Sequence, residues 1–231
     1  MNEPQIPTPG QLWLRYEELI LEVLTEALFS LRNQPILPTE EPAINLEFYF
    51  RIRRVSLDLT RSGRGMIPSV IYEGRNQPIE GETINDKRIK KVPDFQWPII
   101  DDSQTDTSKA YKIFVIECKR LGKPTINKWI FNKNYINHGV IRYISEDWGY
   151  GKDTISGAMI GYIQNMTPND ILIEVNYCAA ESGISAINLS AAGWKNNDVS
   201  RLDQLLDRPN VPPTHFNLRH LWIDLRDKYA S

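Results

Sequence analysis

The stretch KAYKIFVIECKR, residues 109–120, decides the fold of this 231-residue chain. It is rich in β-branched and aromatic residues and too short for a typical helix, so it predicts a β-strand. Because successive side chains of a strand alternate between its two faces, Glu117 and Lys119 end a face that is otherwise apolar. A charge at such a position is costly to bury unless it pairs or binds a metal. The end of this strand is therefore a candidate site.

A second run, RIKKVPDFQWPII at residues 88–100, also predicts a strand. Pro93 has no backbone N–H to donate and is expected to mark a bulge or an edge. If the two runs pair as a hairpin through the polar loop 101–108, the Asp94 carboxylate lies beside that of Glu117. Taken singly, a Pro-Asp pair is typical of a turn, and an acid two residues before a lysine is typical of a solvated strand end. Each occurs only once in the chain, however, and together they indicate one site.

The order and spacing of Asp94, Glu117 and Lys119 resembles the signature of the PD-(D/E)xK nuclease superfamily. The resemblance implies an α/β, restriction-endonuclease-like fold, in which a mixed central β-sheet is flanked by helices and the core follows the order α-β-β-β-α-β. It also implies a Mg²⁺ ion, for which Mn²⁺ can substitute, held by Asp94, Glu117 and the backbone carbonyl of Cys118. Lys119 is then expected near the attacking water, and a further acid is expected on a helix that precedes the sheet.

That further acid falls in residues 40–60, which predict a helix with Thr39 as its N-cap. A strand is the alternative for residues 48–55, which are rich in β-forming residues. If the segment is helical, Glu41 is in line with apolar residues that face the sheet, whereas Glu47 precedes an arginine by four positions and suits a surface ion pair. Glu41 is therefore the predicted metal-directed and catalytic acid, with Glu47 as the second choice.

Charge is distributed unevenly along the chain. The formal net charge is −2, yet residues 87–133 carry eleven basic and five acidic side chains, and they surround the candidate site. Local positive potential attracts a phosphate backbone, so DNA is the expected ligand, with RNA as an alternative. The candidate nucleic-acid contacts are Lys91, Arg120, Lys123, Arg142 and Gln164.

Basic and aromatic residues alternate after the second predicted strand. The residues concerned are Lys123, Lys128, Trp129, Phe131, Lys133 and Tyr135. This pattern is consistent with a surface that follows a nucleic-acid backbone and stacks on its bases. Alternatively, it belongs to an amphipathic connection that packs its aromatic residues inward.

The remaining segments complete the predicted domain organisation. An amphipathic helix over residues 11–33 is expected to pack on the core or on a partner, which divides the chain into residues 1–34 and a nuclease-like domain, residues 35–231. Further helices are predicted over 135–145, 154–166 and 171–180, strands over 66–73 and 216–225, and an irregular insertion near 193–213 around a short helix at 198–206.

Composition is ordinary for a soluble globular protein, with 41% hydrophobic and 24% charged residues. The chain has no apolar run long enough for a membrane span and does not begin like a secretion signal, so a cytoplasmic location without membrane association is expected. Two cysteines and three histidines show no zinc-ligand spacing, which argues against a structural zinc site.

The sequence and the resemblance together predict a Mg²⁺-dependent endonuclease that hydrolyses DNA, with a role in restriction or antiviral defence. A homodimer, or a complex with an ATPase or sensor protein, is expected because no separate DNA-reading domain or motor is evident. A second interpretation keeps the fold but not the chemistry, as a catalytically silent subunit that binds nucleic acid or assembles a larger complex. A third is a structural interaction protein that assembles through its acidic N-terminal helix.

Overall fold

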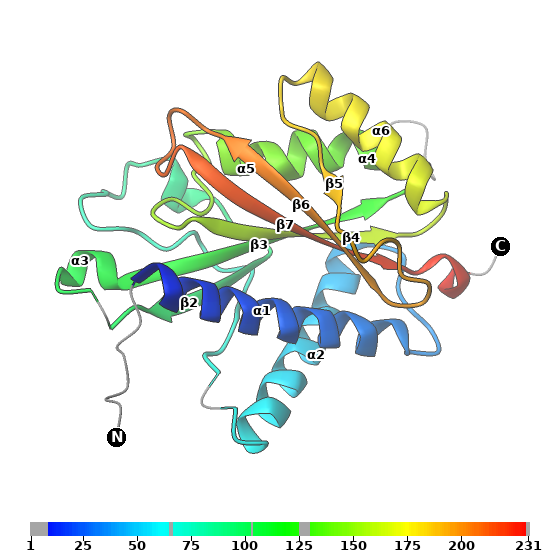
Figure 1. The fold of residues 1–231 in the computed structure, drawn as a ribbon, viewed down its shortest axis with the longest axis horizontal. Coiled ribbons are helices and arrows are strands. Elements are labelled where there is room, and N and C mark those ends of the chain that lie inside the picture. Colours follow the sequence, from blue (N-terminus) through cyan, green and yellow to red (C-terminus); the bar gives the residue numbers. More distant parts are fainter. Residues whose placement is uncertain (1–8, 65–66, 103, 125–129, 230–231) are drawn as a thin grey trace.

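The chain folds around one β-sheet that has helices on both of its faces. A computed structural model describes residues 9–64, 67–102, 104–124 and 130–229 (Figure 1). Within these residues, seven strands form a sheet in the order β1-β2-β3-β4-β7-β6-β5. Their bounds are β1 (Ile71–Tyr72), β2 (Phe95–Ile100), β3 (Tyr111–Leu121), β4 (Ser156–Ile163), β5 (Asn188–Leu189), β6 (Val199–Asp207) and β7 (His215–Asp224).

Strand direction divides the sheet into a parallel centre and antiparallel flanks. β3 pairs in parallel with β4, and β4 pairs in parallel with β7. β1, β2 and β3 form an antiparallel meander on one side, and β5, β6 and β7 are antiparallel on the other. The sequence-based prediction of an α/β chain with a mixed central sheet flanked by helices is therefore confirmed.

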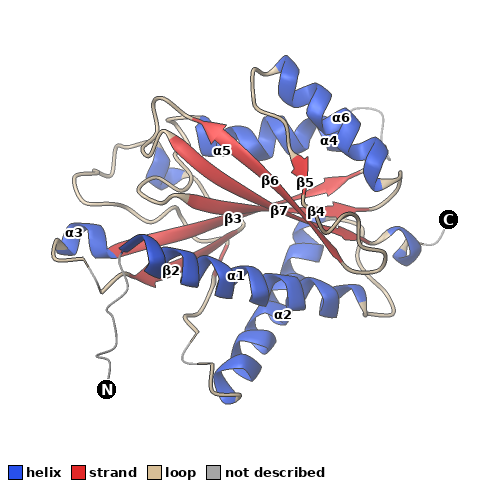
Figure 2. Ribbon diagram, viewed as in Figure 1, coloured by secondary structure: helices blue, strands red, loops and turns tan. Residues whose placement is uncertain are grey.

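Two helical layers cover the sheet (Figure 2). The helices are α1 (Pro9–Arg32), α2 (Glu41–Arg61), α3 (Thr107–Ala110), α4 (Phe131–Tyr135), the π-helical turn η2 (Ile136–Val140), α5 (Ile141–Ile144) and α6 (Pro168–Glu181), with short 3₁₀ turns at Arg88–Lys90 and Arg226–Lys228. α1 and α2 lie on one face, and α4, η2, α5 and α6 lie on the other. The central parallel strands are thus buried from both sides, as is usual for such strands.

Strand β3 carries the alternation that its sequence predicts. Phe114 and Ile116 are packed in the hydrophobic cluster under α1 and α2, whereas Val115 and Leu121 belong to the cluster under α4, α5 and α6. Glu117 follows Val115 by two residues and therefore faces the α4–α5 side. The predicted hairpin is also confirmed, because β2 pairs with β3 in antiparallel register, with Phe95 opposite Ile116.

Several boundaries differ from those predicted. The strand expected over 88–100 begins only at Phe95, because residues 88–90 form a 3₁₀ turn and Pro93 lies before the strand. The strand expected over 66–73 is limited to Ile71–Tyr72 within the described residues. The helix over 40–60 is confirmed and the strand alternative for 48–55 is wrong. Its N-cap residue is Glu40 rather than Thr39.

The prediction of a helix over residues 154–166 is wrong, because this segment forms the central strand β4. Every residue from Ser156 to Ile163 is buried. A short apolar run that is buried on both faces has no alternation, so its periodicity does not distinguish a strand from a helix. Gly161 leaves no room for a side chain between the neighbouring strands. A Cβ atom at this position would lie 2.5 Å from Leu121 Cδ1 and 2.6 Å from Trp222 Cδ1.

The irregular insertion expected near 193–213 contains strand β6, so the short helix predicted over 198–206 is also wrong. Buried and exposed residues alternate along Leu202–Asp207, as in a strand with one covered face. The inward position in the middle is polar: Gln204 is buried and contacts the His220 ring. Because Gln204 is polar but faces inward, the sequence of this segment does not show a regular alternation of apolar and polar residues.

The other predicted elements are confirmed with small shifts. The segment expected as a helix over 135–145 is helical from Phe131 to Ile144 and contains the π-helical turn. The helix expected over 171–180 is α6, and the Thr167 side chain accepts a hydrogen bond from the Asp170 N–H at its start. The strand expected over 216–225 is β7, although it lies inside the sheet rather than at an edge.

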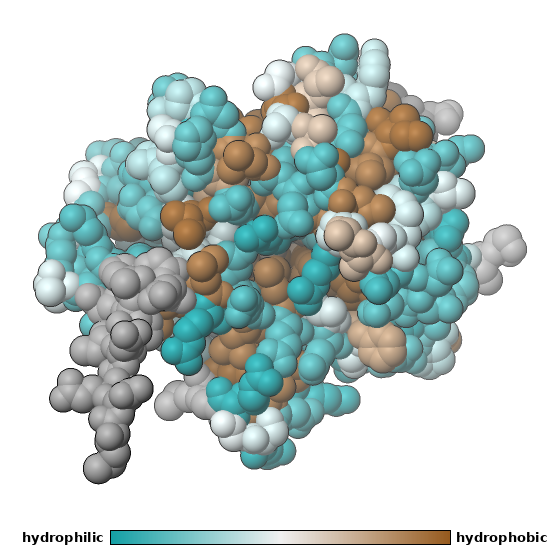
Figure 3. Space-filling view, viewed as in Figure 1, coloured by the Kyte–Doolittle hydropathy of each residue, from teal (hydrophilic) through white to brown (hydrophobic). Residues whose placement is uncertain are grey.

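Exposed large hydrophobic side chains are spread over several elements. They include Leu14 and Phe29 on α1, Ile173 and Tyr177 on α6, and Leu205 on β6. Figure 3 shows hydrophobic patches separated by hydrophilic surface on the face that it presents. Scattered exposure of this kind is normal for a protein surface. Among the described residues, no helix combines the length and hydrophobicity needed to cross a lipid bilayer.

His220 makes the stability of the fold depend on pH. Burial lowers the pKa of this histidine to about 3, and its ring lies between the Tyr135 hydroxyl (2.8 Å) and Gln204 Oε1 (3.2 Å). Below its ordinary pKa of about 6.5, the unfolded chain binds a proton that the folded chain does not bind. The free energy of unfolding is therefore expected to fall as pH decreases from about 6.5 toward 3, by up to about 1.4 kcal/mol per pH unit from this residue.

Urea unfolding of the wild type and of His220→Gln between pH 7 and pH 4 measures this contribution. The difference between the two free energies of unfolding should shrink as the pH falls. His215→Gln, at an exposed position at the start of β7, is the control and should run parallel to the wild type. A constant difference between wild type and His220→Gln over this range would contradict the prediction.

Candidate active site at the end of β3

Three elements that are distant in sequence bring their ends to one place. Glu117 and Lys119 lie near the end of β3, Asp94 immediately precedes β2, and Glu41 is the first residue of α2. The hairpin pairing places the start of β2 opposite the end of β3, and α2 packs against β3. The predicted strand residues and the predicted helix acid are thus brought together by the fold.

The Lys119 ammonium lies at the centre of this group. Its Nζ atom is 2.6 Å from the Cys118 carbonyl oxygen, 2.8 Å from Glu117 Oε1 and 2.9 Å from Glu41 Oε1. Asp94 Oδ2 is 3.9 Å away. Burial on its own would lower the pKa of the ammonium, but the charges of Glu117, Asp94 and Glu41 raise it above its ordinary value. Lys119 is therefore a cation held by three acids.

Glu117 is the most deeply buried acid of the group. Its side chain is fully buried, and Oε1 accepts hydrogen bonds from both Lys119 and Arg142. Its second oxygen, Oε2, is buried without a hydrogen-bond partner among the described residues. A buried carboxylate oxygen in that state is costly, which indicates that this atom has a ligand in the working protein.

Asp94 is held by the strand beside it. Its Oδ2 atom accepts a hydrogen bond of 2.6 Å from the Cys118 N–H. Burial and the charges of Glu117 and Glu41 raise the pKa of Asp94 well above its ordinary value, although Lys119 opposes the shift. Three carboxylates close together repel one another, and one added cation would relieve that repulsion.

The structure distinguishes the two glutamates considered for the helix acid. Glu41 uses both carboxylate oxygens at the site, because Oε1 accepts from Lys119 and Oε2 accepts from the Arg120 N–H at 3.1 Å. Glu47 instead forms an i,i+4 pair with Arg51 at 3.3 Å. Of the two, only Glu41 contacts the strand residues.

The oxygens around Lys119 suit a Mg²⁺ ion in kind. They are carboxylate oxygens and one backbone carbonyl, and Mg²⁺ prefers hard oxygen ligands. Within the part of the chain that the structure describes, no three Asp, Glu, His or Cys side chains form a ready-made metal cluster. The unpartnered Glu117 Oε2 nevertheless supplies an oxygen that a metal ion would satisfy. The residues present therefore fit the ion that the sequence predicts, with Asp94, Glu117, Glu41 and the Cys118 carbonyl as its candidate ligands.

Arg142 and Lys91 extend the site along α5 and the segment before β2. The Arg142 guanidinium contacts Glu117 Oε1 and lies 4.2 Å from the centre of the Trp148 ring. Lys91 Nζ lies 4.4 Å from the same ring. The sequence did not point to Trp148, because it lies in the polar turn after α5 rather than in a periodic segment. Arg142 beside Glu117 and Lys91 beside Trp148 remain candidates for phosphate contact.

The other predicted nucleic-acid contacts are less available. Arg120 donates to the Thr39 carbonyl at 3.1 Å and packs on Phe131, and Gln164 donates to the same carbonyl at 2.7 Å. Gln164 follows β4 rather than lying on a helix. Lys123 is exposed near the start of α6. Of the five candidates, Arg142 and Lys91 therefore lie next to Glu117 or its ring partner Trp148, and Arg120 lies next to Glu41 with its guanidinium directed to Thr39.

The predicted stacking surface is not formed by its described aromatic residues. Phe131 and Tyr135 are buried, with Tyr135 packed against His220 and Trp222. For these two residues the inward-packing alternative is correct. Lys128 and Trp129 lie outside the described residues.

Comparisons with known proteins add no relative at this point. No family model, no curated protein and no solved structure matches the chain. The chemistry of the site is therefore inferred from its own residues.

Proposed function

We propose that this protein is a Mg²⁺-dependent nuclease of the PD-(D/E)xK type that hydrolyses phosphodiester bonds in DNA. One observation carries the proposal. Glu41, Asp94 and Glu117 come from three separated segments, and their carboxylates meet around the Lys119 ammonium. Acids brought together from distant segments are costly to the fold, so such an arrangement favours a catalytic site over a surface ion pair.

The order of the elements supports a restriction-endonuclease-like core. Apart from the 3₁₀ turn Arg88–Lys90 and the one-turn helix α3, the chain order is α2, β1, β2, β3, the α4–α5 helical segment and β4. This succession matches the α-β-β-β-α-β order that the sequence resemblance implies. The helix acid Glu41 precedes the sheet, as the same resemblance implies.

The reaction needs no covalent enzyme intermediate. The chemistry that Mg²⁺ would supply here, if held by the site carboxylates, is that of a Lewis acid for phosphodiester hydrolysis. Asp94, Glu117 and Glu41 supply carboxylates to hold it. Lys119, as a buried cation, donates hydrogen bonds to the attacking water or to the negative charge that develops on the phosphate. Arg142, beside Glu117, neutralises a phosphate oxygen.

The proposal also includes a substrate, a biological role and a partner. Positive charge is concentrated in residues 87–133 and favours a nucleic-acid substrate. DNA as the favoured substrate, with RNA as the alternative, follows from the resemblance. A role in restriction or antiviral defence, and a homodimer or an ATPase or sensor partner, rest on the resemblance alone.

The test is an assay of supercoiled plasmid, linear duplex, single-stranded DNA and RNA, with and without Mg²⁺ or Mn²⁺. The wild type should cut at least one substrate only when the metal ion is present. Lys119→Ala should lower the rate at least about a hundredfold, because it removes the group that stabilises developing charge. Lys195→Ala, at an exposed position, is the control and should cut like the wild type.

Two outcomes would contradict the proposal. One is full cutting by Lys119→Ala. The other is a wild-type protein that cuts none of the substrates, with calorimetry showing no binding of Mg²⁺ or Mn²⁺. Binding of nucleic acid without cutting would favour the catalytically silent subunit instead.

A further inference from the structure

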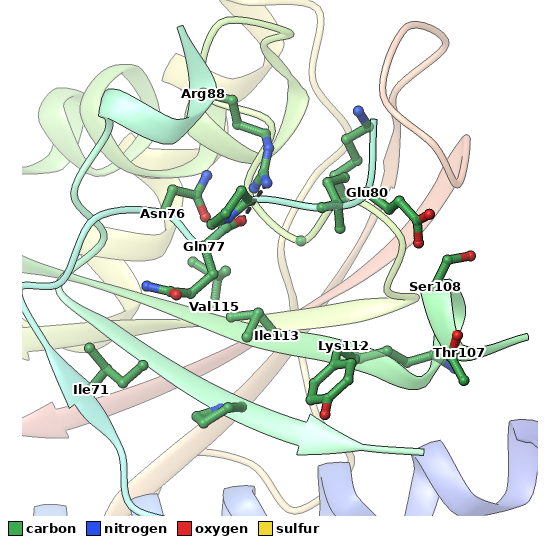
Figure 4. Close-up of a pocket in the computed structure, with 16 residues that line it drawn as sticks. Ile71, Asn76, Gln77, Glu80, Arg88, Thr107, Ser108, Lys112, Ile113 and Val115 are labelled. Carbon is green, nitrogen blue, oxygen red and sulfur yellow. Dashed lines mark hydrogen bonds between the residues drawn. The ribbon is translucent and has the colours of Figure 1, made fainter. Parts of the chain in front are cut away.

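A cavity of about 510 Å³ lies beside the candidate active site (Figure 4). Its floor is the sheet face of β3 that carries Ile113 and Val115, and its rim includes Asn76 and Gln77 of the segment between β1 and β2. This volume falls within the range typical of small-molecule sites. None of the catalytic candidates lines the cavity, so it is a separate feature.

The cavity continues the face of β3 on which the site is built. Tyr111, Ile113 and Val115 all line it, and Glu117 follows at the next position on the same face. The step from Val115 to Glu117 is two strand residues, about 6.6 Å. A ligand in the cavity is therefore next to a group bound at Glu117. Asn76 on the rim is also connected to the site. Its side chain donates to the carbonyl of Trp148, whose ring contacts Arg142.

The charges around the cavity are balanced. Arg88 forms a two-point ion pair with Glu82, at 2.7 and 2.6 Å, in which both side chains are nearly buried. Lys112 pairs with Asp101 at 2.7 Å, and Lys152 lies 3.5 Å from the same Glu82. The acidic lining residue Glu80 offsets the one remaining positive charge. The ligand portion that enters is therefore neutral rather than anionic.

The lining suits a flat heteroaromatic ring. Ile71, Ile79, Ile113 and Val115 supply apolar walls, and Tyr111, which is 67% exposed, supplies an aromatic face at the open end. Asn76 and Gln77 each donate to a backbone carbonyl and keep further donor and acceptor capacity on their carboxamides. Carboxamides are complementary to the edges of nucleobases, and aromatic rings stack on their faces.

We propose that this cavity receives one unpaired nucleobase of the substrate, while the adjacent phosphate lies at Arg142, beside the Glu117 carboxylate. The inference rests on the proposed nuclease function and narrows its substrate to single-stranded nucleic acid or to duplexes with an unpaired nucleotide at the cleavage point. A base in a closed duplex must first be flipped out, and breaking its stacking and pairing costs a few kcal/mol.

The experiment measures binding separately from cutting. A short oligonucleotide with one fluorescent adenine analogue is titrated with the full-length protein in Ca²⁺, both as a single strand and annealed to its complement. The single strand should bind about tenfold more tightly than the duplex, which corresponds to the stacking of one base. A second titration, followed by saturation-transfer NMR, uses free nucleoside monophosphates as probes.

Two variants test the cavity itself. Ile113→Trp fills it, and Tyr111→Ala removes the exposed ring at its mouth. Each should lower single-strand affinity about tenfold, should leave duplex affinity unchanged and should abolish the nucleoside monophosphate signal. Leu205→Trp adds the same side chain at an exposed position on β6 and should bind like the wild type. Equal thermal unfolding temperatures verify that the variants are folded.

The outcomes distinguish the two proposals. If the protein cuts DNA but both cavity variants bind and cut like the wild type, the base cavity is refuted and the nuclease proposal stands. If nucleoside monophosphates bind and the signal disappears in both variants, while no substrate is cut, the cavity stands and the nuclease proposal is refuted. Equal affinity of the wild type for single strand and duplex also overturns the cavity proposal.

Discussion

Asp94→Asn is expected to lower the rate of metal-dependent DNA cleavage at least about a hundredfold, the order observed when one group that stabilises transition-state charge is removed. Asparagine has the size of aspartate and keeps an oxygen that can accept the hydrogen bond now made from the Cys118 N–H at 2.6 Å. It lacks the negative charge with which the aspartate carboxylate attracts a divalent cation. Initial rates of plasmid cleavage over a range of Mg²⁺ concentrations measure the effect.

The same substitution should not weaken the metal-free fold. Burial and the charges of Glu117 and Glu41 raise the pKa of Asp94 well above its ordinary value, so its ionised form is disfavoured in the folded chain. A neutral amide removes that repulsion, and the unfolding temperature of Asp94→Asn without metal should equal or exceed that of the wild type. Lost cleavage together with a lower unfolding temperature would point to misfolding rather than to a missing ligand.

Glu47→Gln is the matched control for Asp94→Asn. Glu47 is the other glutamate considered for the helix acid, and it pairs with Arg51 on the surface of α2. Its loss should change the cleavage rate by less than about twofold, because the Glu47 side chain pairs with Arg51 and not with the site residues. An Asp94→Asn protein that cuts at the wild-type rate would exclude Asp94 from the site.

Arg208→Met is expected to lower the free energy of unfolding by about 3 kcal/mol or more. The Arg208 side chain is fully buried and donates to the backbone carbonyls of Tyr143, Tyr150, Gly151, Thr154, Pro212 and Pro213 at 2.8 to 3.3 Å. Its guanidinium also lies 3.8 Å from the centre of the Phe216 ring. Methionine fills much of the volume but leaves these carbonyls without their donor.

Chemical denaturation of wild type, Arg208→Met and Arg208→Lys measures the loss. Lysine keeps the charge but lacks the planar fork of donors, so it should recover only part of the stability. Arg201→Met, at an exposed position on β6, should stay within about 0.5 kcal/mol of the wild type. A value for Arg208→Met within that same margin would show that the carbonyls find other donors.

The candidate site was predictable because its residues lie in regular elements. Alternation along β3 placed Glu117 and Lys119 on one face, the hairpin pattern brought Asp94 beside them, and helical periodicity separated Glu41 from Glu47. The strand and helix inferences depend on a repeat of about two residues in a strand or 3.6 in a helix, the Asp94 inference on the hairpin pairing, and the search for a helix acid on the resemblance. The structure places these residues together as the pattern predicted.

The parts that were not predictable depend on tertiary contacts. β4 is buried on both faces and therefore lacks a pattern, while the inward Gln204 of β6 is polar because it meets His220 from the neighbouring strand. Trp148 and Arg208 lie in or beside irregular segments, where no repeat links position to environment. Their partners are chosen by the fold of the whole sheet and leave no signal in the local sequence.

The position of β3 inside the sheet has a consequence for the growing chain on the ribosome. β3 is flanked by β2 and β4, and β4 in turn pairs with β7, which begins at His215. Glu41, Asp94 and Lys119 are synthesised early, but the sheet that holds them together is complete only when almost the whole chain has emerged. Under the proposed function, the cutting site of a chain truncated before β7 would therefore rest on an incomplete sheet.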